Sequence, residues 1–181
     1  MIKGFIVLLA LGTAGWYYFI GGRRLDETMV REFYVSQAHA TLARDPEAQC
    51  KLLGKSLALR QETLMAGQTK ADAMNHDQAC ASIRKAHEFF EAAGEKAGGM
   101  LTIEYDYELG KIEIAVDRKS ARVELTSTLK MGEAFMQFRN ASTERVERRL
   151  GQLELVESDV KTRVSWTPGA LADPSKYFES R

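Results

Sequence analysis

The sequence predicts an α+β domain in which helices of the first half cover one face of an antiparallel sheet formed by the second half. The sheet is indicated by residues 101–129, where apolar side chains recur at every second position. A period of two over neighbouring runs is typical of strands with one buried face and one wet face. The apolar positions are Leu101, Ile103, Tyr105, Tyr107, Leu109, Ile112, Ile114, Val116, Ala121, Val123 and Leu125. Breaks at Gly110 and at residues 117–119 are short enough to join antiparallel neighbours.

The amino-terminal segment predicts a single-pass membrane anchor over residues 1–24, inserted in the membrane through residues 4–20. Residues 4–20 carry no charge, and Arg23 follows shortly after them. A helix of this length reaches roughly 27 Å at ~1.5 Å per residue, which is enough to cross the hydrocarbon layer. The aromatic residues 16–18 stand at one end, where such side chains prefer the lipid–water boundary. The alternatives are a cleaved signal peptide, a prepilin-like leader and a buried core helix.

Three helices and one strand are predicted between residues 25 and 99. Apolar residues spaced three and four apart predict an amphipathic helix over 25–43. Asp45 is a good N-cap for a short second helix, with Pro46 at its first position. Residues 56–65 alternate as a strand. The third helix begins near Asn75 or Asp77, and its apolar stripe consists of Cys80, Ile83, His87 and Phe90.

The remaining chain is predicted to continue the sheet. Apolar positions from Met136 to Leu155 extend it, and Gly151 marks a bulge or bend. Glu144 lies in a mixed-charge run that we interpret as exposed. Residues 157–159 are expected to turn the chain into a last strand over 160–166. The globular domain therefore covers residues 25–167, and residues 168–181 form a loose tail.

Composition and motifs exclude several classes of function. The chain has 25 basic and 25 acidic residues, so a nucleic-acid partner is not expected. The three histidines have no metal-ligand spacing, and two cysteines inside helices do not form a metal knuckle. We therefore expect no metal. The sequence has no phosphate loop, nucleophile elbow or glycine-rich dinucleotide turn, so we also expect no cofactor.

Residues 31–34, then residues 42–48 and Leu52-Leu53, resemble the opening of the nuclear transport factor 2-like superfamily. This superfamily includes steroid delta-isomerases and polyketide cyclase-like proteins. The resemblance implies a cone formed by a curved antiparallel sheet wrapped on three helices. Its members include enzymes, binding modules, transport adaptors and secretion-machine subunits, so the resemblance does not assign a function.

Three residues are candidates for catalysis. Steroid delta-isomerases place an oxyanion-donating tyrosine on the first helix, and Tyr34 resembles it. Their carboxylate base follows the second helix, where only Glu62 carries a carboxylate. No residue clearly matches their acid on the sheet. His87 is either a hydrogen-bonded core or pocket-wall histidine or an acid or base. Alternatively, Tyr34 is a packing residue.

The two cysteines indicate the cellular compartment in which the domain lies. The cone architecture implies that the helices carrying Cys50 and Cys80 lie close together, so the two could form a disulfide. The bond would close a loop of about 30 residues and contribute on the order of 3 kcal/mol. Two buried reduced thiols are the alternative. A disulfide indicates an oxidising space, so we expect an inner-membrane protein whose domain faces the bacterial periplasm.

The anchor, and the lack of a complete catalytic set, favour a membrane-anchored periplasmic binding or scaffold module. Such a module would act through its pocket on a small apolar ligand or through its sheet on a protein partner. The alternative is a small cofactor-free isomerase or cyclase-like enzyme acting on an apolar ligand. The resemblance also implies a homodimer formed through the sheet.

Overall fold

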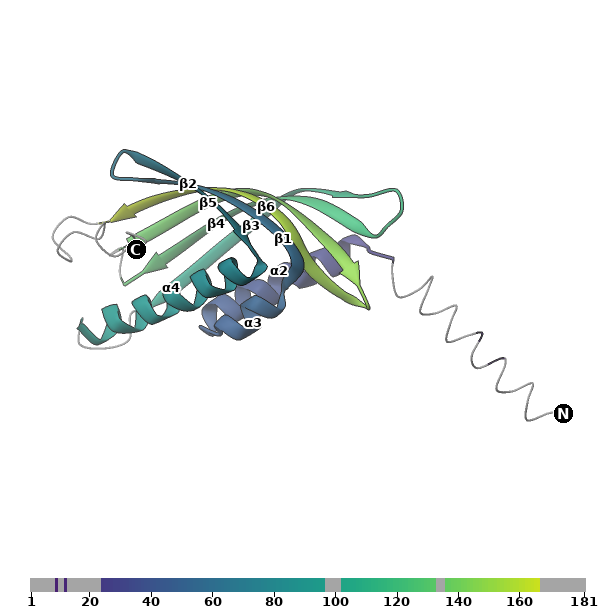
Figure 1. Cartoon of the computed structure of the whole chain (residues 1–181), viewed down its shortest axis with the longest axis horizontal. Coiled ribbons are helices and arrows are strands. Elements are labelled where there is room, and N and C mark those ends of the chain that lie inside the picture. The colour runs from purple at the N-terminus through teal and green to yellow at the C-terminus, as the bar shows by residue number, and fades with distance from the viewer. Residues whose placement is uncertain (1–8, 10–11, 13–23, 97–101, 133–135, 167–181) are drawn as a thin grey trace.

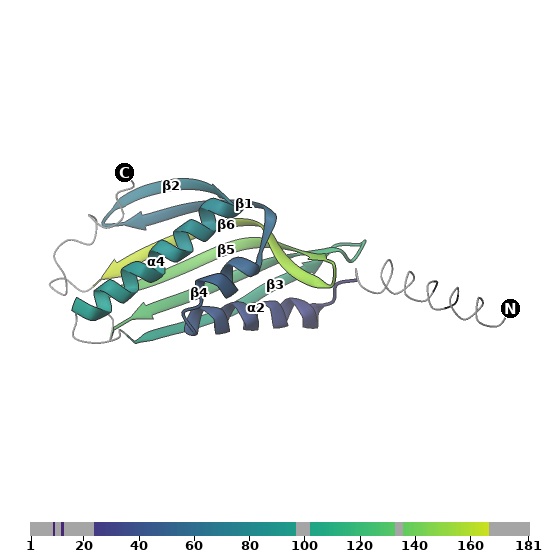
Figure 2. The same cartoon turned by 60° about the horizontal axis from the view of Figure 1, so that its bottom comes forward.

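The computed structural model describes residues 9, 12, 24–96, 102–132 and 136–166. They form one curved sheet with helices packed on one of its faces (Figures 1 and 2). The elements in chain order are α2 (Glu27–Leu42), α3 (Pro46–Lys51), β1 (Leu53–Met65), β2 (Gln68–Asn75), α4 (His76–Lys96), β3 (Ile103–Ile114), β4 (Ser120–Met131), β5 (Met136–Arg149) and β6 (Gln152–Trp166). The α+β class and the helix-covered sheet are confirmed.

The sheet is mixed, whereas the sequence predicted an antiparallel one. The six described strands lie in the order β2-β1-β6-β5-β4-β3, and β1 pairs with β6 in parallel. The other four pairings are antiparallel. A parallel pair needs a long connection between its strands, and here nearly the whole domain lies between β1 and β6. No local pattern in the sequence reveals such a pairing.

Side-chain caps begin the helices, and Asp45 is the cap that the sequence predicted. Asp26 Oδ1 accepts the backbone N–H of Met29 at 2.9 Å, and Asp45 Oδ1 accepts that of Ala48 at 2.9 Å. Reciprocal contacts between Asn75 and Gln78, both 3.0 Å long, begin α4 as a capping box. The first helix, the short second helix and the start of the third therefore agree with the sequence prediction to within about two residues.

Three strand boundaries differ from the prediction. Gly110 does not separate two strands but lies at a register shift inside β3, where the backbone passes close to Glu124. Residues 157–159 do not turn, because β6 continues through them, and the turn falls instead at Leu150 and Gly151. Residues 68–75 form the edge strand β2. Its side chains are nearly all exposed, so it lacks the apolar alternation that reveals a strand.

The core lies between α2 and the middle of the sheet. Val30, Phe33 and Tyr34 of α2 are buried in one cluster with Val123 of β4 and Val146 of β5. α2 packs mainly against β3, while α4 packs against β1 and β2 and also contacts α3. The apolar face of the alternating strands is therefore covered by the helices, as predicted.

None of the helices in the described part of the chain is long and apolar enough to cross a membrane. The predicted anchor over residues 1–24 lies almost entirely outside the described residues. The predicted tail, residues 168–181, lies outside them as well.

Candidate functional site

A pocket of about 260 Å³ lies between α4 and the helix-covered face of the sheet. Its walls are largely apolar, with a few amide, hydroxyl and imidazole groups among them. The lining residues are Thr41, Gln49, Gln61, Ile83, Ala86, His87, Phe90, Ile103, Leu129, Phe138, Asn140 and Thr162. Apolar walls with a small number of orienting polar groups are typical of small-molecule sites.

Aromatic rings build one wall of the pocket. The centroids of Phe90 and Phe138 are 6.5 Å apart with an interplanar angle of 65°. His87 meets Phe90 at 6.3 Å and 71°. These edge-to-face arrangements are the favoured ones for aromatic pairs, so α4 and β5 are joined across the pocket by well-packed rings.

Among the lining residues of the pocket next to α4, His87 is the one with a titratable side chain. Gln49 Nε2 lies 3.4 Å from the Ala40 carbonyl and 3.2 Å from His87 Nε2. Because the amide nitrogen donates to the carbonyl and has a second hydrogen to give, His87 accepts at Nε2 and carries its proton on Nδ1. Burial lowers the pKa of His87 below its usual 6.5, against an opposing effect of Glu91. Burial therefore favours the neutral form of His87.

A buried polar cluster lies beside the pocket, in the core beneath α2. The hydroxyl of Tyr34 donates to Glu144 Oε2 at 2.9 Å. Ser142 and Ser158 donate to Glu144 Oε1 at 3.0 Å and 3.4 Å. Tyr34 is 1% exposed and Glu144 is 5% exposed. Neither is among the lining residues of the pocket next to α4, so this cluster is packed and not open to a ligand.

The electrostatics of this cluster follow from its burial. Burial raises the pKa of Glu144 above 4.5, and the three hydroxyl donors partly oppose the shift. Burial also raises the pKa of Tyr34, with the nearby Glu144 carboxyl adding to the effect. The tyrosine thus remains a donor, and the carboxyl is held as an acceptor of several hydrogen bonds.

The three candidate catalytic residues do not converge. Tyr34 lies in the core cluster and His87 in the pocket wall, while Glu62 lies on the opposite, outer face of the sheet. Gln61 takes the inward position, and its amide donates to Thr63 and Thr162 at 3.2 Å and 3.4 Å. An amide cannot act as the carboxylate base that the resemblance implies.

Sequence reasoning missed Glu144, which was expected to be exposed in a mixed-charge run. Glu144 is buried because it lies on the same face of β5 as Ser142 and Val146, two positions away on either side. The alternation of β5 was the signal that could have found it. Glu144 is therefore a buried carboxyl on the sheet that the sequence analysis did not single out.

Cys50 of α3 and Cys80 of α4 lie at disulfide-bonding distance, with their Cα atoms 5.4 Å apart. This separation is within the usual range for a disulfide. The bond joins the two helices that carry Gln49 and His87, and it therefore fixes one side of the pocket.

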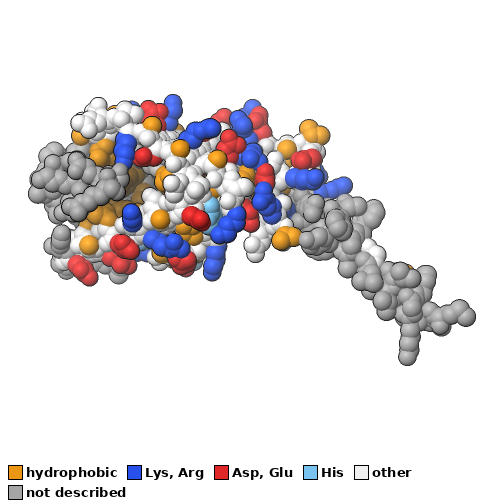
Figure 3. Space-filling view, in the orientation of Figure 1, with side chains coloured by type: hydrophobic (Ala, Val, Ile, Leu, Met, Phe, Trp, Pro, Cys, Tyr) orange, Lys and Arg blue, Asp and Glu red, His pale blue; other side chains and the backbone are white. Residues whose placement is uncertain are grey.

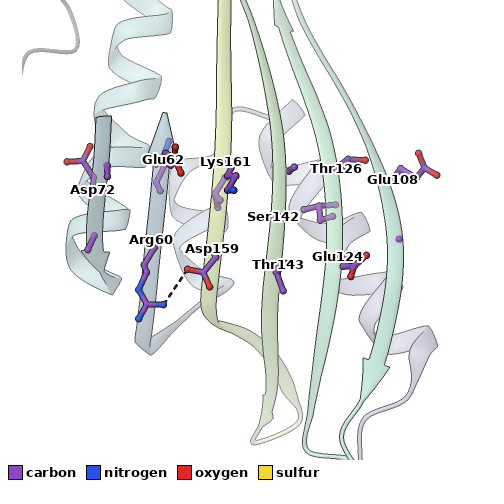
Figure 4. A pocket seen from close by; sticks show the side chains of 17 residues that line it. Arg60, Glu62, Asp72, Glu108, Glu124, Thr126, Ser142, Thr143, Asp159 and Lys161 are labelled. Carbon is purple, nitrogen blue, oxygen red and sulfur yellow. Dashed lines mark hydrogen bonds and ion pairs between the residues drawn. The ribbon is translucent and has the colours of Figure 1, made fainter. Parts of the chain in front are cut away.

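The outer face of the sheet carries a second, wider trough of about 940 Å³. Short side chains such as Thr126, Ala141 and Thr143 form its floor, and charged side chains surround it (Figure 4). Arg60 and Asp159 form an exposed ion pair of 3.4 Å across neighbouring strands. This face is charged and wet. Within the described residues, no group of three histidine, cysteine or acidic side chains could hold a metal ion.

Solved structures share this architecture. A putative scytalone dehydratase from Novosphingobium aromaticivorans matches with a TM-score of 0.56 and 10% identity, covering 85% of this chain and 94% of that chain. A nuclear transport factor 2-like protein of unknown function from Shewanella oneidensis matches at 0.55 and 15% identity, over 74% and 97%. A ketosteroid isomerase-like protein from Erwinia carotovora atroseptica matches at 0.51 and 11% identity, over 75% and 94%.

No family model matches the chain, and the comparison with curated proteins found no match. The chain shares the nuclear transport factor 2-like fold with these solved structures. The resemblance seen in the sequence is confirmed at the level of the fold. At these identities the likeness does not extend to an activity.

Proposed function

We propose that this protein is a membrane-anchored binding module that holds a small, largely apolar ligand in the pocket between α4 and the sheet. The observation that carries the proposal is the composition of the pocket wall, which has aromatic and aliphatic surfaces and no carboxylate among its lining residues. His87, Gln49 and Asn140 can orient a polar end of the ligand by hydrogen bonds. Such a wall supports binding better than acid–base chemistry.

The placement of the carboxyl groups supports a non-enzymatic role. Gln61 faces inward where the isomerase resemblance implies a base, and Glu62 faces the outer trough. The hydroxyl of Tyr34 is already used by Glu144, and both side chains are buried. A ligand in the pocket therefore meets no carboxylate among the lining residues and no free Tyr34 hydroxyl.

The proposed compartment is the periplasm, with the domain held at the inner membrane by residues 4–20. The uncharged segment at the amino terminus supports the anchor. The disulfide distance between Cys50 and Cys80 supports an oxidising space, because such bonds are rare in the bacterial cytoplasm.

Co-purification tests the binding proposal. The full chain is purified from detergent-solubilised membranes, and the small molecules that it retains are identified by mass spectrometry. Ala86→Trp fills the pocket from α4, and Ala92→Trp places the same side chain on an exposed position of that helix. We expect a compound retained by the wild type and by Ala92→Trp but lost from Ala86→Trp. No difference between the two variants would refute the proposal.

The second candidate is a cofactor-free isomerase or cyclase-like enzyme. It is favoured by the buried pair of Tyr34 and Glu144 together with a neutral His87 at the pocket. Incubating the retained compound with protein separates the two functions. A compound recovered unchanged supports binding, whereas conversion that is lost in His87→Gln supports the enzyme.

A further inference from the structure

Two hairpin tips at one end of the domain expose large apolar side chains. Val116 in the β3–β4 connection is 104% exposed and Leu150 in the β5–β6 turn is 76% exposed, the highest values for large hydrophobic residues in the described part of the chain. The bases of the two hairpins touch, because the backbone N–H of Arg148 donates to the Lys119 carbonyl at 2.9 Å. Figure 1 shows both hairpins pointing toward the end where the chain leads into α2.

Leu150 is not the residue that its turn favours. Its φ is 49°, and Gly151 follows with φ 87° between the paired residues Arg149 and Gln152. Two-residue turns with two positive φ angles prefer Asn-Gly, and leucine is strained there. The β1–β2 hairpin at the other end has the same arrangement with Ala66. A large apolar residue is therefore unnecessary for the turn and makes little contact within the domain.

Basic side chains surround these tips. Arg24, Arg118 and Lys119 are exposed, and none of them forms an ion pair within the described residues. Of the neighbouring acids, Glu147 pairs with Arg149 at 3.1 Å. Asp117 lies on the same tip and accepts the backbone N–H of Lys119 at 3.0 Å, so its negative charge offsets one of the three basic side chains. Figure 3 shows basic and hydrophobic side chains together at this end of the domain.

Arg24 and Leu25, which begin the domain, are held at the same end by hydrogen bonds. Leu25 is fully buried, and its backbone N–H donates to the Arg118 carbonyl at 2.6 Å. Arg148 donates to the carbonyl of Arg24. The uncharged residues 4–20 therefore precede a point that is fixed between the two hairpins.

We propose that this end of the domain docks on an anionic phospholipid surface, with Val116 and Leu150 inserted among the headgroups and Arg24, Arg118 and Lys119 facing lipid phosphates. Exposed apolar side chains within a basic surface are the combination that holds proteins at such interfaces. The inference rests on the proposed anchor for bringing the domain to a bilayer. The docking itself is a property of the folded domain and fixes its orientation.

Spin labels on the full chain in vesicles test the docking. Gln152 and Gln68 each follow a two-residue turn, at the basic end and at the opposite end, and both are exposed. Gln152→Cys and Gln68→Cys each receive a nitroxide, since Cys50 and Cys80 are paired. In vesicles of phosphatidylcholine with phosphatidylglycerol, we expect the label at position 152 to be exposed to lipid-dissolved oxygen and shielded from an aqueous nickel complex. The label at position 68 remains accessible to water.

Variants resolve the contributions of charge and apolar contact. Arg118→Gln with Lys119→Gln should lower the ratio of docked to undocked domain about 25-fold, roughly five-fold for each cation. Leu150→Asn should reduce immersion while keeping the turn. Ala66→Leu places a leucine in the equivalent turn at the other end and should not immerse the label at position 68.

The outcomes separate docking from anchoring. A water-accessible label at position 152, on chain that resists an alkaline wash of the vesicles, overturns docking and leaves the anchor standing. An immersed label on chain that the wash removes supports docking and overturns the anchor. Equal immersion in pure phosphatidylcholine overturns the role of the cations. A label shielded from both oxygen and nickel indicates contact with protein and overturns lipid docking.

Discussion

Tyr34→Phe tests whether the buried cluster stabilises the fold through the hydrogen bond to Glu144. The substitution removes a donor at 2.9 Å and leaves the carboxyl with Ser142 at 3.0 Å and a longer contact to Ser158. Leaving a buried acceptor without its donor costs about 1–3 kcal/mol. We therefore expect a loss of about 2 kcal/mol at pH 7, or a decrease in Tm of about 4–8 °C for a domain of this size.

The assay is urea or thermal unfolding of Tyr34→Phe alone and together with Glu144→Gln. Glutamine removes the carboxyl that accepts from Tyr34, so the cost of Tyr34→Phe in that background should decrease to about 1 kcal/mol. An equal cost in both backgrounds would show that Tyr34 acts through packing alone, and the reasoning would be wrong.

The pH dependence of stability follows from the same carboxyl. Burial raises the pKa of Glu144 above 4.5, so the native state binds this proton more tightly than the unfolded state. The resulting stabilisation is complete below pH 4.5 and is lost as the pH rises through the native pKa. Relative to Glu144→Gln, the wild type should therefore gain stability as the pH is lowered from 7 toward 4.5. If the difference in the free energy of unfolding between wild type and Glu144→Gln is constant over this pH range, the raised pKa of Glu144 is contradicted.

Three further stability predictions concern the disulfide, a close contact and a turn. Replacing Cys50 and Cys80 by alanine should cost about 3–4 kcal/mol, and a reductant should destabilise the wild type but not the variant. Gly54→Ala should cost about 1–3 kcal/mol in urea unfolding, because its Cβ would lie 3.0 Å from Val156 Cγ1, and an unchanged midpoint would refute the close packing. Leu150→Asn should raise stability by up to ~1 kcal/mol in thermal unfolding, because asparagine tolerates the positive φ, and a lower Tm would contradict the strain.

The parts of the fold that the sequence predicted are those with a local signal. Asp26 and Asp45 cap helices whose apolar residues recur at helical spacing, and β4 alternates along its whole length. The edge strand β2 has no apolar face, so its existence depends on pairing with β1, which lies beside it only once the hairpin forms. The parallel pairing of β1 with β6 joins the two ends of the domain and has no local signal at all.

The sequence predicts the inward-facing residues of the candidate site only if the two-residue period of each strand is followed at every position. Leu57, Leu59 and Thr63 alternate on the inner face of β1, and the same period places Gln61 inside and Glu62 outside. A shift by one residue moves a side chain to the other face of the sheet. A carboxylate at the neighbouring position therefore cannot replace a carboxylate at the expected position. The same period places Glu144 inside, although its charge suggested the surface.

The pocket and the proposed docking end lie at opposite ends of the sheet. Ile103 is at the start of β3, and its partner Met131 is at the end of β4, whereas Val116 and Leu150 follow the far ends of β3 and β5. A domain that docks through those tips holds the pocket away from the bilayer. Its ligand would then come from the aqueous compartment, even though the pocket wall is largely apolar, because the lipid phase touches the other end of the molecule. The two proposals thus constrain each other through the geometry of a single sheet.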